Sequence, residues 1–498
     1  MVRACVLGAL VAFFALIVVA VIRNGWVFEY PLDDVYIHLA MAEQMALGGY
    51  GVNAGEVASA ASSPIYPLFL TPFAGTEVQG WLPLVWNLLF LVVAAALLGK
   101  ILSEARLGRA GPFIAFLAPA ALTIYVVAYA GMENMAHGAA SLAIVLGLWR
   151  YVETGRISLT LILGLLLAPA FRLEGLALAL LAGGLVLRLG RIPAGLGLML
   201  IGIAPVVGFA AFLMSQGLEP LPASVTAKLG DQPDEGALAN LRLNVATYGG
   251  RYLLALSTVL ALLSFTLWRS DIRRAYFGLA LAAAGFAHLA FGSTGWLDRY
   301  ENYAVLVTFA GIALVLADRA QLVKVTVLAI ALLGGAWTYG PYIPNNLANM
   351  RAIHQQQSQM SRFVKDHVKA PVAVNDLGYV AWRNPHYVLD LWGLASKEAL
   401  VLRQAGECTN WADDLADRNG VVLAMIYEER LGCFLGPDWV RLGSLWTLDA
   451  DGAFLGGPEV AFYARNEAQA ERLRSELVSW SKGLPDGAEF VAVEGADG

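Results

Sequence analysis

Long apolar runs separated by short polar segments fill the first two thirds of the chain. About 20 consecutive apolar residues suffice for a helix to cross a bilayer. The pattern therefore predicts a polytopic α-helical membrane protein with about 11 transmembrane helices. The runs 158–169 and 174–187 are short and are interrupted near Pro169, Arg172 and Glu174. The expected helices are 4–22, 81–99, 113–130, 135–149, 158–169, 174–187, 193–214, 252–268, 275–292, 303–317 and 322–339.

The pattern changes after residue 340. Short apolar runs alternate with turn residues, which is typical of strands, and 466–481 has the spacing of a helix with one polar face. We expect a transmembrane domain at 1–340 and an α/β domain at 341–498, with 483–498 loosely ordered. The expected strands are 371–375, 387–391, 421–427 and 460–463.

The basic residues predict an orientation. Cytoplasmic loops carry an excess of Lys and Arg, and with the N-terminus inside the count is thirteen inside against six outside. An odd number of spans then places 341–498 outside, together with the polar loops 24–80, 215–250 and 293–302. Run 4–22 is longer than a signal-peptide core, so we expect a retained anchor. The inner residues are Arg3, Lys100, Arg106, Arg109, Arg150, Arg156, Arg188, Arg191, Arg269, Arg273, Arg274, Arg319 and Lys324; the outer ones are Arg23, Arg172, Lys228, Arg242, Arg251 and Arg299.

Composition narrows the function classes. The chain is 58% hydrophobic and 14% charged, against about 25% charged in soluble proteins. Its net charge of −6 argues against a nucleic-acid partner. Of its three cysteines, Cys5 lies in the first run, and Cys408 and Cys433 lie in the expected outer domain. A disulfide is permitted there, and the sequence leaves open whether it forms.

Two adjacent acids, Asp33 and Asp34, stand at the start of the first outer loop, in the segment PLDDVYIH (31–38). Ionisable residues at a membrane boundary usually face water, a partner or a substrate. After them, 37–45 has the spacing of an amphipathic helix on the membrane surface. Two hypotheses account for the acids. In one they cap that helix; in the other one of them acts as a general base, its pKa raised by its neighbour. We expect only one to face a cavity. A divalent cation shared by both is a further possibility.

Three cations are candidates for binding a phosphate. Lys228 and Arg299 lie in expected outer loops, and Arg172 lies in FRLEG (171–175). Each has a structural alternative: Lys228 and Arg299 as interfacial anchors, and Arg172 as a partner of Glu174. Further candidates to line a substrate cavity are Tyr36, His38, Glu56, Glu133 and Glu174.

Several of these motifs resemble, in order along the chain, the GT-C glycosyltransferases, most nearly the mycobacterial terminal arabinofuranosyltransferases and related bacterial membrane proteins. They are DDVYI (33–37), GGYGVNAGE (48–56), SSP (62–64), GMEN (131–134), FRLEG (171–175) and TAK (226–228). The resemblance covers about residues 1–340. It implies a polyprenyl-phosphate sugar donor, a glycan or lipid-linked acceptor of the cell envelope and inversion at the anomeric carbon. It gives the base role to Asp33, with Asp34 beside it, in a bacterial inner membrane with a periplasmic C-terminal domain.

The chain departs from the pattern of that family at three places. ASAA (58–61) replaces an acidic-Gly-aromatic stretch, PASV (222–225) replaces a Pro-Asn-Thr-aromatic run, and His38 stands where an aromatic residue is common. Sugar and acceptor are therefore left open. Two other functions compete with the enzyme: a transporter or lipid flippase, for which internal repeats and broken helices near the midplane are expected, and a sugar-binding scaffold of the envelope that would tolerate changes at Asp33.

Overall fold

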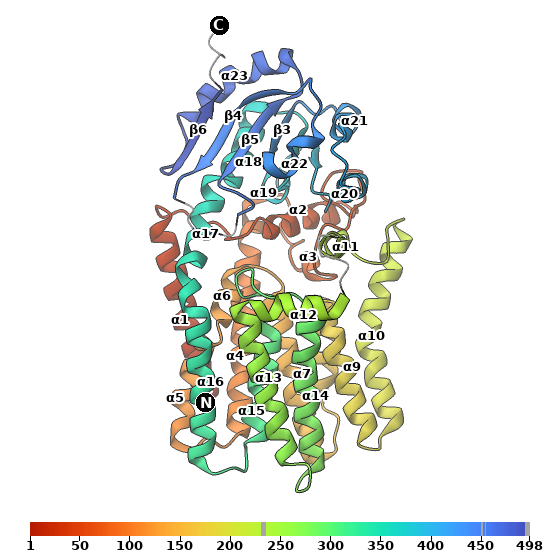
Figure 1. Cartoon of the computed structure of the whole chain (residues 1–498), viewed down its shortest axis with the longest axis vertical. Helices are drawn as coiled ribbons and strands as arrows, with labels where there is room; N and C mark the ends of the chain where they lie inside the picture. The colour runs from red at the N-terminus through yellow and green to blue at the C-terminus, as the bar shows by residue number, and fades with distance from the viewer. Residues whose placement is uncertain (231–235, 450–451, 454, 494–498) are drawn as a thin grey trace.

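The chain forms a helical bundle at one end and a sheet at the other, with short helices between them (Figure 1). The structure is a computed structural model that describes residues 1–230, 236–449, 452–453 and 455–493, without the side chains of 228–230. The bundle and the sheet are joined by a run of helical segments over Gln321–Val368. The division into two domains at residue 340 stays a prediction.

Long apolar helices build the bundle. Among the described residues, seven helical segments are long and apolar enough to cross a membrane, so the molecule is a multi-pass membrane protein. Each of the eleven expected runs lies mainly on a helix, one of them broken, and the number of complete crossings stays a prediction. The bundle helices are α1 (Val2–Arg23), α4 (Leu82–Glu104), α5 (Gly111–Ala121), α6 (Ile124–Tyr129), α7 (Asn134–Thr154), α8 (Leu159–Phe171), α9 (Gly175–Arg188), α10 (Ile192–Ser215), α13 (Tyr248–Thr266), α14 (Ile272–Phe291), α15 (Asn302–Val315) and α16 (Gln321–Tyr339).

Burial separates the central helices from those that face lipid. All of α15 is buried, as is most of α7. By contrast, α10 exposes Leu196, Leu200 and Val207, and α16 exposes Leu333 and Trp337. Exposed apolar side chains on this scale are costly in water and are expected on helices that contact acyl chains. The exposed faces therefore define the outside of a membrane-embedded bundle.

The third expected run is broken into α5 and α6. Pro119 lies inside the last turn of α5, where it removes a backbone hydrogen bond, and Thr123 takes a left-handed conformation with φ of 52°. The Asn302 side-chain amide donates to the Leu122 carbonyl at 2.8 Å. An amide from α15 thus satisfies a backbone group that the break exposes.

A layer of short helices separates the bundle from the sheet (Figure 1). One of them, α2, differs from the expected amphipathic surface helix because every residue from 35 to 42 is buried. The bundle covers one side of α2 and the sheet layer covers the other. The short helices of this layer are α2 (Asp34–Ala46), α3 (Tyr66–Phe69), α11 (Ala223–Gly230) and α12 (Gly236–Ala246), and the 3₁₀ segments of the first 340 residues are η1 (Glu77–Trp81) and η2 (Gly108–Ala110).

In the described part of the chain the sheet has six strands, in the order β2-β1-β3-β5-β4-β6. The first three pair in parallel, with Val372 opposite Val388 in β2 and Leu423 in β3; the other pairs are antiparallel. Four strands coincide with those expected, whereas β4 and β6 were not predicted, and β6 lies in the stretch expected to be loosely ordered. The strands are β1 (Val372–Val374), β2 (Val388–Asp390), β3 (Leu423–Ile426), β4 (Val440–Thr447), β5 (Glu459–Ala464) and β6 (Ala488–Ala492).

Helices pack around this sheet, and a disulfide joins two of its loops. Cys408 and Cys433 are bonded, with their Cα atoms 5.2 Å apart, which settles the pairing that the sequence left open. The expected helix 466–481 is α23 (Glu467–Ser481), capped by Asn466. The other helical segments after α16 are η3 (Gly340–Tyr342), α17 (Ile343–Gln355), α18 (Gln357–Phe363), η4 (Val364–Val368), α19 (Gly378–Ala381), α20 (Lys397–Gln404), α21 (Trp411–Arg418), α22 (Glu428–Leu431) and η5 (Gly432–Phe434).

Candidate active site

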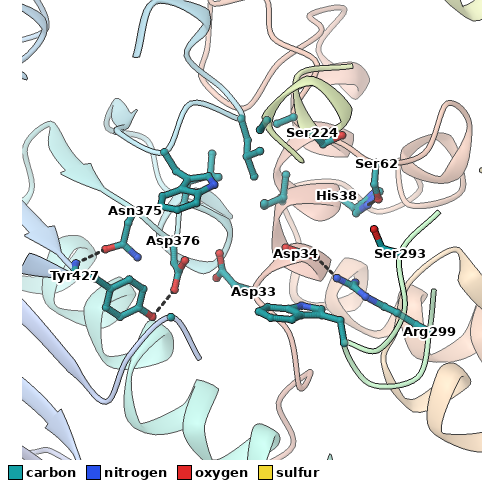
Figure 2. Close-up of a pocket in the computed structure, with 18 of the residues that line it drawn as sticks. Asp33, Asp34, His38, Ser62, Ser224, Ser293, Arg299, Asn375, Asp376 and Tyr427 are labelled. Atoms are coloured by element: carbon teal, nitrogen blue, oxygen red, sulfur yellow. Dashed lines mark hydrogen bonds and ion pairs between the residues drawn. The ribbon is translucent and has the colours of Figure 1, made fainter. Parts of the chain in front are cut away.

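A cavity of about 440 Å³ lies where the first outer loop, the loop before α15 and the sheet meet (Figure 2). Segments far apart in the sequence therefore build it together. Its polar and aromatic lining comes from three regions: Asp33, Asp34, His38 and Ser62 from the first outer loop; Ser293, Trp296, Arg299 and Tyr300 from the loop before α15; and Asn375, Asp376, Trp392, Tyr427 and Arg430 from the sheet. Ser224 of α11 completes the polar part of the lining.

Asp33 binds the sheet layer rather than its own helix. Its two carboxylate oxygens accept hydrogen bonds from the backbone N–H groups of Gly378 and Tyr379, at 2.7 and 2.8 Å, and its side chain makes no capping bond to α2. The interpretation of Asp33 as a cap of its own helix is therefore wrong, because its carboxylate caps α19 instead. Burial raises the pKa of Asp33 well above its ordinary value, and the nearby Asp376 raises it further.

Asp34 also lines the cavity, so the expectation that only one acid would do so is wrong. The two adjacent side chains diverge, and each finds its own partner (Figure 2). Asp34 Oδ2 lies 2.7 Å from Nη2 of Arg299. Arg299 is 2% exposed, and its Nε and Nη1 have no hydrogen-bond partner among the described residues. Of these two adjacent acids, Asp34 therefore pairs with a cation, whereas Asp33 binds backbone N–H groups.

This donor set does not suit a divalent cation shared by Asp33 and Asp34. Both carboxylate oxygens of Asp33 already accept hydrogen bonds from N–H groups, whose positive ends point at the place a cation would take. Asp34 already pairs with Arg299. Over the described part of the chain, no group of three or more His, Cys, Asp or Glu residues is arranged to hold a metal ion. The possibility of a shared cation therefore finds no support in the geometry.

Behind the cavity lies a buried ionic network centred on Arg172. Its guanidinium binds Glu133 at 2.8 Å and Glu174 at 2.6 Å, and the Ser62 hydroxyl donates to Glu133 at 2.8 Å. His38 Nε2 is 3.3 Å from that hydroxyl. Arg172, Glu133 and Glu174 do not line the cavity. The structural alternative for Arg172 therefore holds, and its role as a phosphate ligand does not fit.

Two other predicted cavity residues lie at the contact between the first outer loop and the sheet. The Tyr36 hydroxyl donates to Glu29 at 2.8 Å, and its ring lies 4.0 Å from that of Tyr379. Glu56 accepts from Asn53 at 2.8 Å and from the Tyr387 hydroxyl at 3.1 Å. Neither Tyr36 nor Glu56 lines the cavity, so both hold the layers together instead. The side chain of Lys228 lies outside the described residues.

The sequence reasoning missed the residues that the sheet contributes. Asp376 stands two residues after β1 and accepts hydrogen bonds at 2.8 Å from the Tyr427 hydroxyl and from the side-chain amide of Gln357. Burial raises the pKa of Asp376, although these hydrogen bonds oppose the rise. One signal was available: polar residues directly after predicted strands, where ligands of open sheets bind. The strand pattern instead predicts Asn375 and Tyr427 as the last residues of the strands 371–375 and 421–427.

Fold and cavity together define the class. A multi-pass helical bundle with a polar cavity beneath a small extramembrane sheet domain is the architecture of the GT-C fold. The chain is similar to ArnT from Cupriavidus metallidurans, solved bound to undecaprenyl phosphate: the alignment covers 93% of this chain and 97% of that chain, at 13% identity and a TM-score of 0.52. The predicted GT-C fold is thereby confirmed, while the likeness to arabinofuranosyltransferases stays a prediction.

Two sequence comparisons complete the picture. Residues 348–463 match a family described as a domain of unknown function, DUF8728. This match lies across the sheet side of the cavity and includes Asp376 and Tyr427. A search of curated proteins finds no significant match.

Proposed function

We propose that this chain is a membrane glycosyltransferase that moves a sugar from a polyprenyl-phosphate donor to a cell-envelope acceptor, from the outer side of a bacterial inner membrane. One observation carries the proposal: the half-buried Asp33 and the guanidinium of Arg299 line one cavity. The fold shared with ArnT, whose structure holds undecaprenyl phosphate, supports a donor of that kind. A base and a phosphate ligand are the two groups that such a transfer needs.

The residues present can carry out the transfer in one displacement. The acceptor O–H gives its proton to the carboxylate of Asp33 as its oxygen forms a bond to the anomeric carbon. The bond from that carbon to the phosphate oxygen breaks, and the phosphate leaves with the electron pair. Arg299, which lies in the same cavity, offsets the charge that develops on the phosphate. Attack opposite the leaving group inverts the anomeric carbon.

The location of the cavity disfavours the transporter alternative. Transporters bind substrates near the bilayer midplane between broken helices, whereas this cavity lies at one end of the bundle, against the sheet (Figures 1 and 2). The identity of the sugar rests on the sequence resemblance alone. A polyprenyl-phosphate arabinofuranose is therefore the first donor to test, followed by polyprenyl-phosphate hexoses.

The proposal is tested by sugar transfer in lipid nanodiscs with the wild type, Asp33→Asn and Asp34→Asn. General-base catalysis is worth about 10²–10⁴-fold, so Asp33→Asn should lose at least the lower of these factors. An amide has one acceptor oxygen for two N–H groups, so this variant also weakens the contact with α19. Binding of undecaprenyl phosphate is therefore measured alongside, as a check that the variant is folded. Wild-type transfer rates in Asp33→Asn would refute the base role, and no transfer by the wild type from any donor would refute the function.

A further inference from the structure

The sheet side of the cavity is formed at the carboxyl ends of parallel strands. Asn375 and Asp376 follow β1, Tyr427 follows β3, and Trp392 stands two residues after β2. The strand order β2-β1-β3 means that the chain leaves β1 toward one neighbour and later returns to its other side. In open sheets, ligands bind in the crevice outside the carboxyl ends at such a switch point. Here that point, between β1 and β3, opens into the cavity.

Hydrogen bonds hold the polar groups of this switch point in place. Asn375 Oδ1 accepts from the backbone N–H of Tyr427 at 2.9 Å and so ties the ends of β1 and β3 together. The Tyr427 hydroxyl and the Gln357 amide both bind Oδ2 of Asp376. Figure 2 shows the carboxylate of Asp376 beside that of Asp33, and the two are close enough to interact electrostatically. The switch point thus presents fixed hydrogen-bond acceptors beside the proposed base.

We propose that this switch point is the acceptor site, that the acceptor is a carbohydrate, and that Asp376 accepts a hydrogen bond from an acceptor hydroxyl next to the one that reacts at Asp33. This inference rests on the proposed function and adds the class of acceptor to it. An ionised carboxylate only accepts hydrogen bonds. Two carboxylates in one cavity can therefore accept hydrogen bonds from two neighbouring hydroxyls of one sugar ring. The Trp392 side chain lies in the same wall. The Arg403 guanidinium lies 4.1 Å from the centre of its ring, which leaves the rest of the ring to contact a sugar.

The sheet wall carries one cation, Arg430, but charge separates the pair Asp33 and Asp376 from the donor side. The acidic groups Asp33 and Asp376 lie beside each other, and neither has an ion pair with a cation among the described residues. Arg299 lies on the opposite side with Asp34 (Figure 2). A phosphate would be repelled by these two acids and drawn to the guanidinium. The arrangement therefore favours an uncharged polyhydroxy group at the sheet and the donor phosphate at Arg299.

The test measures binding of small glycosides to the full chain in nanodiscs. The probes are methyl α-arabinofuranoside and methyl β-glucoside, detected by saturation-transfer NMR, with cyclohexylmethanol as a ring that lacks neighbouring hydroxyls. We expect a glycoside to bind the wild type and its affinity to fall about tenfold in Asp376→Asn, since hydrogen bonds to charged groups are the strong ones. Tyr427→Phe removes one of the hydrogen bonds that position Asp376, and it should weaken glycoside binding less than Asp376→Asn does.

Asp413→Asn is the matched control. Asp413 is an acid of the same sheet layer that accepts from the Gly436 N–H and the Trp439 indole, and it does not line the cavity. This variant should bind glycosides like the wild type, and thermal unfolding of all variants checks the fold. In the transfer assay Asp376→Asn should raise the KM for acceptor and leave the KM for donor unchanged.

The outcomes separate the inference from the function. Equal glycoside affinity in Asp376→Asn and the wild type, or no glycoside binding by the wild type, would overturn the inference. Equal binding of cyclohexylmethanol and the glycosides would overturn it too, because neighbouring hydroxyls would then not be recognised. If glycosides bind in an Asp376-dependent way but no polyprenyl-phosphate donor is used, the glycosyltransferase proposal fails while the carbohydrate site stands.

Discussion

Asp33 serves two physical roles with one carboxylate. It holds N–H groups that lie 345 and 346 residues further along the chain, and it faces the cavity where we place the reacting hydroxyl. Hydrogen bonds from N–H groups favour the charged carboxylate, whereas burial and the neighbouring acid disfavour it, and the balance leaves its pKa raised. A raised pKa makes Asp33 a better proton acceptor than an exposed aspartate.

This balance predicts a pH dependence of activity. The base must be ionised, so kcat/KM should fall as the pH drops through the raised pKa of Asp33, above the range of an ordinary aspartate. The groups that act on this pKa are Asp376 and Asp34, which raise it, and the N–H groups of α19, which lower it. Asp376→Asn removes the acid that raises the pKa of Asp33 more strongly. Its acid limb should therefore lie at lower pH than that of the wild type.

The measurement is kcat/KM against pH between about 4 and 8, with Asp413→Asn as the control that keeps the wild-type profile. Because Asp33 and Asp376 interact, the wild-type limb belongs to the pair rather than to either residue. An acid limb that stays at the same pH in Asp376→Asn would show that the two acids do not interact in the working enzyme.

Arg299 gives a second prediction at the residue scale. It has N–H groups left over after its bond to Asp34, and bonds between a guanidinium and a phosphate are charge-assisted. Arg299→Gln should therefore weaken binding of undecaprenyl phosphate by about 10- to 100-fold, the range expected for a hydrogen bond to a charged group. Arg242→Gln, a charge removed from the exposed side of α12 at the same end of the bundle, should leave binding unchanged. Equal affinities of the two variants for undecaprenyl phosphate would show that the phosphate does not bind Arg299.

At the scale of elements, the loop that carries Arg299 is strained. Trp296, Leu297 and Asp298 all have positive φ, between 55° and 61°, and each such residue costs roughly 1–2 kcal/mol. Glu301 holds the loop by accepting the Gly295 N–H at 2.7 Å. Burial raises the pKa of Asp298 well above its ordinary value, and the nearby Glu301 raises it further. The surrounding structure therefore forces this loop into the form that places Arg299.

Asp298→Asn should stabilise the protein at neutral pH. Asparagine adopts left-handed backbone conformations more readily than most residues do, and the substitution removes a buried charge. The pKa of Asp298 is higher in the folded protein than in the unfolded chain. Asp298 therefore does not destabilise the fold below the unfolded pKa, and it destabilises the fold increasingly as the pH rises from the unfolded to the folded pKa. The gain in Tm, of the order of a few degrees, should therefore be larger at pH 7.5 than at pH 4.5. A gain that is equal at both pH values would show that charge is not its cause.

Sequence patterns predicted the helices well and the ionic partners poorly. A run such as 303–317 is recognisable because transmembrane helices are long and apolar, and α15 lies on it. Asp33 and Asp34 stood out because charges are rare beside such runs. By contrast, the sequence offered only Glu174 as a partner of Arg172, which it does bind, and nothing local shows that Arg172 also binds Glu133, 39 positions earlier. Asp376 was missed because one acid after a short strand is common turn chemistry until the sheet order is known.

At the scale of the whole molecule, the disulfide tests the orientation. Cys408 and Cys433 are bonded in the sheet layer, and such bonds persist only in oxidising compartments. If that layer is periplasmic, SDS-denatured protein from cells should react with one maleimide-PEG without reductant, at Cys5, and with three after reduction. Three labels without reductant would place the sheet in the cytoplasm and contradict the predicted orientation. A Cys408→Ser, Cys433→Ser double variant, which has one thiol under both conditions, is the control.

The way Asp33 reaches across the molecule has a consequence for biosynthesis. The residue enters the membrane region among the first 40 to be synthesised, but its N–H partners and Asp376 belong to the last third of the chain. Until the ribosome has completed the sheet strands and they have folded, the cavity lacks the walls that the sheet contributes. The first helices are therefore inserted before the cavity is assembled, and folding of the sheet completes it.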